Sequence, residues 1–171
     1  SNDNGNDVDD GDDRQRDVPM APAAPVPAAR PAAPACSAAG QESAFTSDDG
    51  RVTVRVFGTM SRSIRLSIRM PLDPGATPPP PGPIVGGLLF QLIAEECGGG
   101  PIPVLPAEVN LGARYSDADA AGLNEQNFTI ARLDTNTNQW RTVEKQVADP
   151  NNNFDSATIT EMGYYVVYQR S

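Results

Sequence analysis

The side chains that most often perform enzyme chemistry are sparse in this sequence. The chain contains no histidine, so it lacks the commonest general base and any ordinary Ser-His or Cys-His nucleophile. A histidine-ligated zinc is excluded for the same reason. Asp117 and Asp119 are carboxylates spaced for acid–base work, but they fall in a short capped corner where exposure is expected. The sequence therefore predicts that the protein is not an enzyme and has no catalytic residue.

Cation binding is a second kind of chemistry that the residue types allow. Residues 1–17 form an acidic low-complexity tail in which carboxylates recur around two glycines, as they do in calcium loops. The candidate ligands are Asp3, Asp7, Asp9 and Asp12. The tail lacks the glutamate that closes such a loop, so a solvated acidic arm is the simpler interpretation. No other cofactor is expected.

The two cysteines, Cys36 and Cys97, offer one disulfide. Closing so long a loop is worth roughly 4 kcal/mol in the chain-entropy model. Reduced or intermolecular thiols are the alternatives. A disulfide and an Asn/Asp-rich tail favour an extracellular or cell-surface protein. Ser1 followed by a polar tail is typical of a mature end left after removal of a signal peptide, although an artificial start would look the same.

The charge distribution narrows the classes of partner. The formal net charge is −9, and residues 1–17 hold seven aspartates against Arg14 and Arg16. Such a chain is a poor partner for nucleic acid or an anionic membrane surface. The longest apolar run, residues 84–94, is broken by glycine and glutamine and is too short to cross a bilayer. We expect neither nucleic-acid binding nor membrane insertion.

An arginine-rich strand face is the main candidate for an interaction surface. Strands are expected at residues 51–57 and 64–70, because apolar residues occupy alternate positions in both. The outward positions hold Arg51, Arg55, Arg65 and Arg69. If the two strands pair, all four arginines stand on one face, and like charges across a pair favour an acidic partner. The face is then either solvated or covered by the acidic tail of its own chain or the next one.

Residues 18–43 form a Pro/Ala-rich extended arm or linker. Prolines separated mostly by alanine favour polyproline II, which is extended and stiff before any binding occurs. This arm is either a spacer or a docking segment that lies in a groove of a neighbouring copy. In the second case Val18, Met20 and Val26 are its expected apolar contacts.

The elements that must position all of these residues are β-strands. Residues 44–171 show short alternating segments separated by turns, which predicts an all-β fold: a single antiparallel β-sandwich of about eight or nine strands. Near its centre, Ser116 is expected to cap one helical turn that Gly122 ends, with Leu123 beneath the corner. Trp140 is expected to pack in the core.

Residues from 49 to the end resemble the β-sandwich domain family shared by ankyrins, netrin receptors and zonula-occludens proteins, in a version like those of bacterial surface and secreted proteins. The matching segments are residues 49–54, 106–111, 114–119 and 122–125, Trp140, and residues 147–150. The resemblance implies a scaffold or adaptor role. Some members cut themselves at a His-Phe-Ser step near the last strand, but residues 162–165 read Met-Gly-Tyr-Tyr, so no self-cleavage is expected.

These features predict a non-catalytic structural subunit of an extracytoplasmic assembly, such as a surface filament, pilus-like fibre or sheath. In this interpretation the N-terminal arm docks on a neighbouring subunit, so that the protein self-associates. The alternative is a surface-tethered binding or adhesion module with the arm as a spacer, which would contact other surface proteins or glycans. Its binding patch would have to come from Tyr115, Trp140 and the proline-rich loop of residues 71–83.

Overall fold

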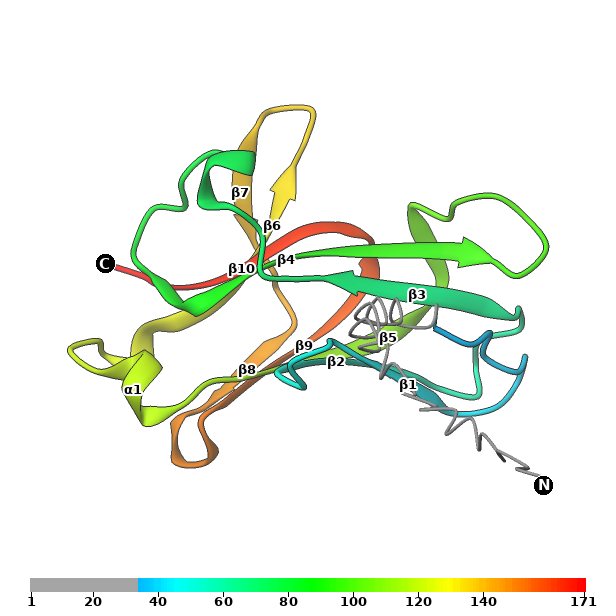
Figure 1. The fold of residues 1–171 in the computed structure, drawn as a ribbon, viewed down its shortest axis with the longest axis horizontal. Coiled ribbons are helices and arrows are strands. Elements are labelled where there is room, and N and C mark those ends of the chain that lie inside the picture. The colour runs from blue at the N-terminus through cyan, green and yellow to red at the C-terminus, as the bar shows by residue number, and fades with distance from the viewer. Residues whose placement is uncertain (1–33) are drawn as a thin grey trace, which may run out of the picture. The chain divides into compact units, whose positions relative to one another are not determined.

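The computed structural model describes residues 34–171, which form two five-stranded antiparallel sheets packed face to face (Figure 1). The first sheet has the order β1-β2-β5-β9-β8. Its strands are β1 (Ser43–Thr46), β2 (Val52–Val56), β5 (Val104–Arg114), β9 (Phe154–Glu161) and β8 (Gln146–Asp149). The second sheet has the order β3-β4-β10-β6-β7. Its strands are β3 (Ile64–Arg69), β4 (Ile84–Glu96), β10 (Gly163–Gln169), β6 (Phe128–Asp134) and β7 (Gln139–Thr142). The predicted all-β sandwich is confirmed.

Alternation of side chains along the strands explains why the two sheets bury one common core. In β2, Val52 and Val54 are completely buried, whereas Thr53 between them faces outward. The second sheet presents the same pattern, and the rings of Phe90 and Tyr165 stack with their centroids 6.0 Å apart. Such inward-facing rows from both sheets are what a sandwich requires.

The strand boundaries differ from the prediction in three places. β1 was not expected, because its residues read Ser-Ala-Phe-Thr and carry little apolar alternation. The sequence predicts one strand that runs from Trp140 through Val143 to Val147, but these residues belong to two strands, since β7 and β8 lie in different sheets. Ile102 and Val104, between prolines, predict a separate edge segment, but Val104 is continuous with the following strand as β5, whose pairing with β9 shifts register between Val104 and Val109. Pro106 lies in that interval, where a residue without an N–H cannot complete the ladder.

The capped corner between β5 and β6 has the predicted form. Ser116 is the N-cap of α1 (Asp117–Ala120): its Oγ accepts from the Asp119 N–H at 3.1 Å, and its own N–H donates to the Asp119 carboxylate at 2.9 Å. Gly122 follows with a φ of 77°, and Leu123 packs against the core. The alternating segments on the two sides of the corner predict an antiparallel unit, but this prediction is wrong, because the corner carries the chain from the first sheet to the second.

The proline-rich loop of residues 71–83 lies over the outer face of the second sheet. The backbone N–H of Leu72 donates to the Leu89 carbonyl at 3.0 Å, and Trp140 Nε1 donates to the Pro78 carbonyl at 2.7 Å. Trp140, Leu72 and Ile84 pack against a small second cluster of buried side chains: Leu89, Ala131, Val166 and Tyr168. Trp140 therefore packs on the outer face of the second sheet and is not part of the core that lies between the two sheets.

The compact unit that contains the sandwich includes the described residues from 34 to 171. It therefore includes residues that the sequence analysis assigned to the arm. Three further short helical turns occur in it: η1 (Pro74–Ala76), η2 (Glu125–Asn127) and η3 (Pro150–Asn152).

Candidate functional site

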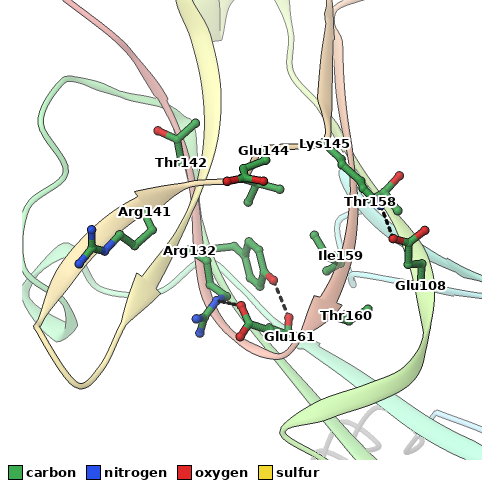
Figure 2. Close-up of a pocket in the computed structure, with 12 residues that line it drawn as sticks. Glu108, Arg132, Arg141, Thr142, Glu144, Lys145, Thr158, Ile159, Thr160 and Glu161 are labelled. Atoms are coloured by element: carbon green, nitrogen blue, oxygen red, sulfur yellow. Dashed lines mark hydrogen bonds and ion pairs between the residues drawn. The ribbon is translucent and has the colours of Figure 1, made fainter.

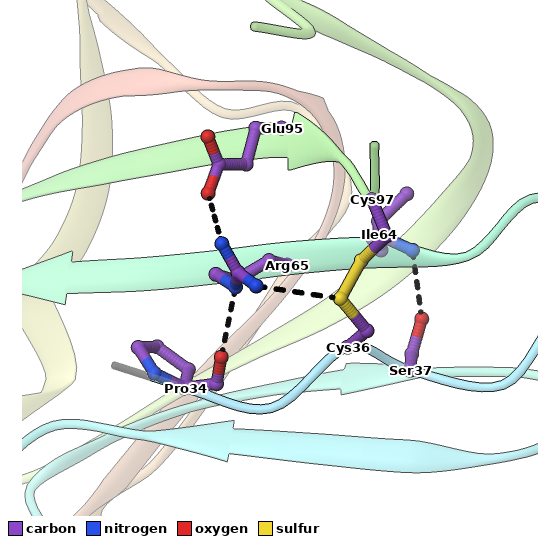
Figure 3. Close-up of a disulfide and its surroundings, with 7 residues drawn as sticks. All are labelled: Pro34, Cys36, Ser37, Ile64, Arg65, Glu95 and Cys97. Carbon is purple, nitrogen blue, oxygen red and sulfur yellow. Dashed lines mark hydrogen bonds and ion pairs between the residues drawn. A yellow bond between two sulfur atoms is a disulfide. The ribbon is translucent and has the colours of Figure 1, made fainter. Parts of the chain in front are cut away.

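The base of the N-terminal arm is fastened to the sandwich by covalent and polar contacts (Figure 3). Cys36 and Cys97 form a disulfide that links positions 61 residues apart, which confirms the pairing offered by the sequence. Ser37 is buried; its N–H donates to the Ile64 carbonyl at 2.8 Å, and its Oγ accepts from the Ile64 N–H at 3.1 Å. These contacts cover β3, an edge strand of the second sheet.

Arg65 completes this fastening, which we call the arm clamp (residues 34–37, Arg65 and Cys97). Its Nε donates to the Pro34 carbonyl at 3.0 Å, and its NH1 group pairs with Glu95 at 2.8 Å. Figure 3 shows the guanidinium between Glu95, Pro34 and Cys36. A guanidinium can serve all these acceptors because its donors form a rigid planar fork. The chain therefore leaves the sandwich at a fixed point.

The predicted four-arginine face is wrong. It required β2 and β3 to pair, but β2 pairs with β1 and β5, whereas β3 pairs only with β4. Arg51 and Arg55 consequently lie on the first sheet, and Arg65 and Arg69 on the second. Consecutive strands of a sandwich can belong to different sheets, and alternation alone does not reveal which of them pair. The role of the four residues in an interaction stays a prediction.

Arg51 belongs to a structural corner. Its side chain pairs with Asp49 at 2.8 Å and donates to the Gly86 carbonyl at 2.6 Å. Burial raises the pKa of Asp49, but hydrogen bonds from Arg51 and Ser47 outweigh it and leave that pKa below its usual value. Gly86 has a φ of 51°, and a Cβ there would lie 2.5 Å from Cγ of Asp119. Glycine thus lets β4 pass close beneath the α1 corner.

A shallow groove on the outer face of the first sheet combines arginines with aromatic rings. We call it the Arg–Phe groove; it encloses ≈ 470 Å³ and includes Arg55, Phe57, Arg114 and Phe154. The Arg114 guanidinium lies 5.3 Å from the centroid of the Phe154 ring. Gly112 makes room for that ring, because a Cβ there would lie 2.8 Å from it. Phe57 remains 40% exposed.

A second cavity of ≈ 370 Å³ opens between the sheets beside β7 and β9 (Figure 2). Four of its charged side chains form two ion pairs: Arg132 contacts Glu161 at 2.9 Å, and Lys145 contacts Glu108 on the opposite wall. The Tyr165 hydroxyl donates to the Glu161 backbone carbonyl, and burial raises the pKa of this tyrosine. The cavity is lined by charged and polar side chains, and burial keeps the Tyr165 hydroxyl in its neutral form.

The groove depends on residues that the sequence analysis did not single out. Arg114 and Phe154 are cross-strand partners in β5 and β9, and Gly112 is the cross-strand partner of Thr53. An alternating strand with glycine two residues before an outward arginine is a weak signal of such packing. Pairing of β5 with both β2 and β9 brings these residues together, and the sequence alone does not give that pairing.

The corner carboxylates act in local structure. Asp119 completes the capping box of Ser116, and Asp117 accepts a hydrogen bond from the Asn153 side chain at 2.7 Å. Tyr115 is buried against Phe128 in an edge-to-face pair. Tyr115 and Trp140 therefore do not form an exposed aromatic patch. The prediction that the protein is not an enzyme stays a prediction.

Several predicted residues lie outside the described part of the chain. These are the calcium candidates Asp3, Asp7, Asp9 and Asp12 and the arm contacts Val18, Met20 and Val26. Between residues 34 and 171, no three carboxylate, histidine or cysteine side chains are grouped as metal ligands. No helix in the same range is long and apolar enough to span a membrane.

Comparisons with known proteins found no matching family model, no matching curated protein and no matching solved structure. What can be said of the class of protein follows from the geometry: it is a disulfide-clamped antiparallel β-sandwich. The family resemblance rests on the sequence segments alone.

Proposed function

We propose that this chain is a non-catalytic structural subunit of an extracytoplasmic assembly, in which the N-terminal arm of one copy docks on the sandwich of the next. The observation that carries the proposal is the arm clamp. A disulfide and the Arg65 contacts anchor the arm at Pro34, so a load on the arm passes to the β3–β4 edge. A mere spacer would not need its base fixed in this way.

The Arg–Phe groove is the surface that best suits the arm of a neighbouring copy. The tail has seven aspartates for the guanidinium groups of Arg55 and Arg114, and the arm has apolar side chains for the exposed Phe57 ring. Residues 18–33 would span roughly 50 Å if extended as their composition predicts, which is long enough to reach another subunit. An already extended segment loses little entropy on binding.

The compartment is part of this proposal. An intramolecular disulfide persists in oxidising environments and is rare in the cytosol, which supports a location outside the cytoplasm. A surface filament, pilus-like fibre or sheath is the kind of assembly in which a clamped arm would link consecutive subunits.

Two measurements test the docking of the arm. The full chain should form assemblies in light scattering, and a chain that begins at Pro34 should be a folded monomer by the same method and by circular dichroism. A labelled peptide of residues 1–33 should then bind to this shortened chain. Replacing Arg55 and Arg114 by Glu should lower the affinity for the peptide by about tenfold or more, since each charge reversal replaces an attraction by a repulsion.

A control for each single reversal is Arg170→Glu, which makes the same charge change as Arg55→Glu or Arg114→Glu alone, at an exposed position close to the C-terminus. It should leave peptide affinity within about twofold, because the expected loss depends on place and not on net charge. Normal assembly by the shortened chain would refute the proposal. If assembly needs the arm but is not weakened by the Arg55 and Arg114 replacements, the arm docks on a neighbouring copy at a place other than the Arg–Phe groove.

The cavity of Figure 2 favours one alternative, a surface-tethered binding module with the arm as spacer. Its volume of ≈ 370 Å³ and its polar walls suit a small polar ligand or a sugar unit. A full-length protein that stays monomeric at high concentration would support this alternative. Binding to other surface proteins or glycans would then be the next property to measure.

A further inference from the structure

The start of β9 places a carboxylate where the sandwich otherwise buries apolar side chains. Asp155, Ala157 and Ile159 alternate on the inward face of this strand, and Asp155 is only 2% exposed. Its cross-strand neighbours are Ala113 in β5 and Ala148 in β8, which offer it no side-chain donor. No side chain donates a hydrogen bond to either of its carboxylate oxygens, although the Asp149 backbone N–H lies close enough to lower its pKa. An ionised carboxylate is rarely buried unless it is paired or bound to a metal.

Two further buried oxygen atoms lie in the same part of the fold. The Tyr115 hydroxyl and Glu125 Oε1 lie close enough to each other to affect the pKa of Tyr115, and neither has a hydrogen-bond partner beyond this pair. The Tyr115 N–H donates to the Asn153 carbonyl at 3.1 Å, which brings the end of β5 to the turn that precedes Asp155. Burial and the charges of Asp155 and Glu125 raise the pKa of Tyr115, as expected if the three side chains are neighbours.

The pKa of Asp155 agrees with this arrangement. Burial raises it to about 6 against the lowering effect of the Asp149 backbone N–H, and the charges of the Glu125 and Asp149 carboxylates add to the increase. Asp149 is itself occupied, because its Oδ2 accepts from the Asn152 side chain at 2.7 Å. The buried oxygens that have no side-chain partner outside the group are therefore those of Asp155, Glu125 and Tyr115, which we call the Asp155 cluster.

The atoms of the Asp155 cluster are all oxygens, and two of the three side chains are carboxylates. A single proton would neutralise one carboxylate and leave the charge of the other uncompensated. A divalent cation would balance both negative charges and accept several oxygens at once. Calcium suits this set best, because it takes six to eight oxygen ligands in flexible geometry, including carbonyls and water, whereas magnesium demands a tight octahedron.

We propose that the Asp155 cluster binds one calcium ion through the carboxylates of Asp155 and Glu125 and the hydroxyl of Tyr115, with water or backbone carbonyls completing the shell. The ion would join the end of β9 to the η2 turn and thereby fasten the α1 corner to the first sheet. This site is distinct from the acidic tail and does not depend on the docking of the arm.

Thermal unfolding of the full chain tests the site. After treatment with EDTA, addition of 1 mM CaCl2 should raise Tm by roughly 5 °C, because a ligand that binds only the folded state stabilises it. MgCl2 at the same concentration should raise Tm much less. Titration calorimetry should give one ion per chain, and terbium should show luminescence sensitised by Tyr115 that calcium displaces.

Variants decide where the ion binds. Asp155→Asn and Glu125→Gln should each abolish the calcium-dependent rise in Tm, and the second variant serves if the first does not fold. Asp48→Asn removes one charge from an exposed turn and should keep the full rise. Replacement of Asp3, Asp7, Asp9 and Asp12 together by Asn should also keep it. No rise in the parent chain, a rise retained by Asp155→Asn, or an equal rise with magnesium would overturn the proposal.

Discussion

At the scale of single residues, the position of a charged side chain in the fold decides what it does. Asp119 and Asp155 are both aspartates close to the α1 corner, yet the first closes a capping box and the second is buried with no side-chain partner. Arg55 and Arg65 were expected on one face, but Arg65 is engaged at the base of the arm, whereas Arg55 lines an exposed groove. The same residue type thus fastens the chain in one place and, in another, lines an open groove with only an exposed ion pair to Glu42 at 3.5 Å.

Asp155 should make the stability of the metal-free protein depend on pH. Its pKa is about 6 in the folded chain against an ordinary 3.8, so the folded state holds the proton more tightly. The stabilisation is complete below pH 3.8 and is lost as the pH rises through about 6. Asp155→Asn cannot ionise, so it should gain about 2 kcal/mol over the parent chain between pH 4 and 7. Urea unfolding in EDTA measures this difference.

The parent and variant must be compared at each pH, because other groups act in the opposite direction. The pKa of Asp134 is lowered by the Asn136 N–H, so its contribution is lost as the pH falls. Asp48→Asn, at an exposed turn, should track the parent chain throughout. A difference between parent and Asp155→Asn that does not change with pH would show that the carboxyl does not titrate as proposed.

At the scale of elements, the arm clamp and the proline-rich loop each cover part of the second sheet. Ser37 hydrogen bonds protect the open edge of β3, and the loop buries the outer cluster around Leu89. A free strand edge is a site of unwanted pairing between chains, so covering it guards against aggregation. The disulfide holds the first of these covers in place.

Removal of the disulfide should destabilise the sandwich. Replacing Cys36 and Cys97 by Ser should lower the free energy of unfolding by about 2–4 kcal/mol, because the bond closes a long loop in the unfolded chain. Urea unfolding of the variant should match that of the parent chain kept in reducing agent. An unchanged midpoint in both would mean that the non-covalent contacts of the clamp suffice.

At the scale of the whole molecule, the proposed assembly depends on attraction between a highly acidic tail and arginines on another copy. The tail contributes a large share of the −9 net charge, whereas the groove presents Arg55 and Arg114 beside aromatic rings. Attraction of this kind acts between exposed charges and also favours rapid encounter.

Assembly should therefore weaken as salt is added. Raising NaCl from about 0.05 to 0.5 M shortens the screening length to a few ångströms and should lower the apparent association constant by about tenfold. Sedimentation velocity of the full chain measures the effect. Sodium sulfate at equal ionic strength screens charges to a similar extent but strengthens the burial of apolar groups. Assembly that depends on charge should therefore weaken in both salts, whereas assembly that depends on apolar contacts should strengthen in sulfate. Assembly that is insensitive to salt would assign the docking to the apolar residues of the arm.

The sequence by itself determined the elements that depend on near neighbours. Alternation of valine and isoleucine predicted the strands, and Ser116 with Gly122 predicted the capped corner, because these patterns act over a few residues. Two cysteines also allowed only one intramolecular pairing, with free or intermolecular thiols as the alternatives, and the structure contains that pairing. Each of these features follows from local geometry or from simple counting.

Only the tertiary structure decided which strands are neighbours, and every candidate site depends on that choice. It separated Arg51 and Arg55 from Arg65 and Arg69 by placing β2 and β3 in different sheets. It also joined Arg114 to Phe154 and buried Asp155 inside the sandwich. The physical reason is that strand pairing is set by the joint burial of many distant side chains, whereas alternation records only which face of a strand is inward.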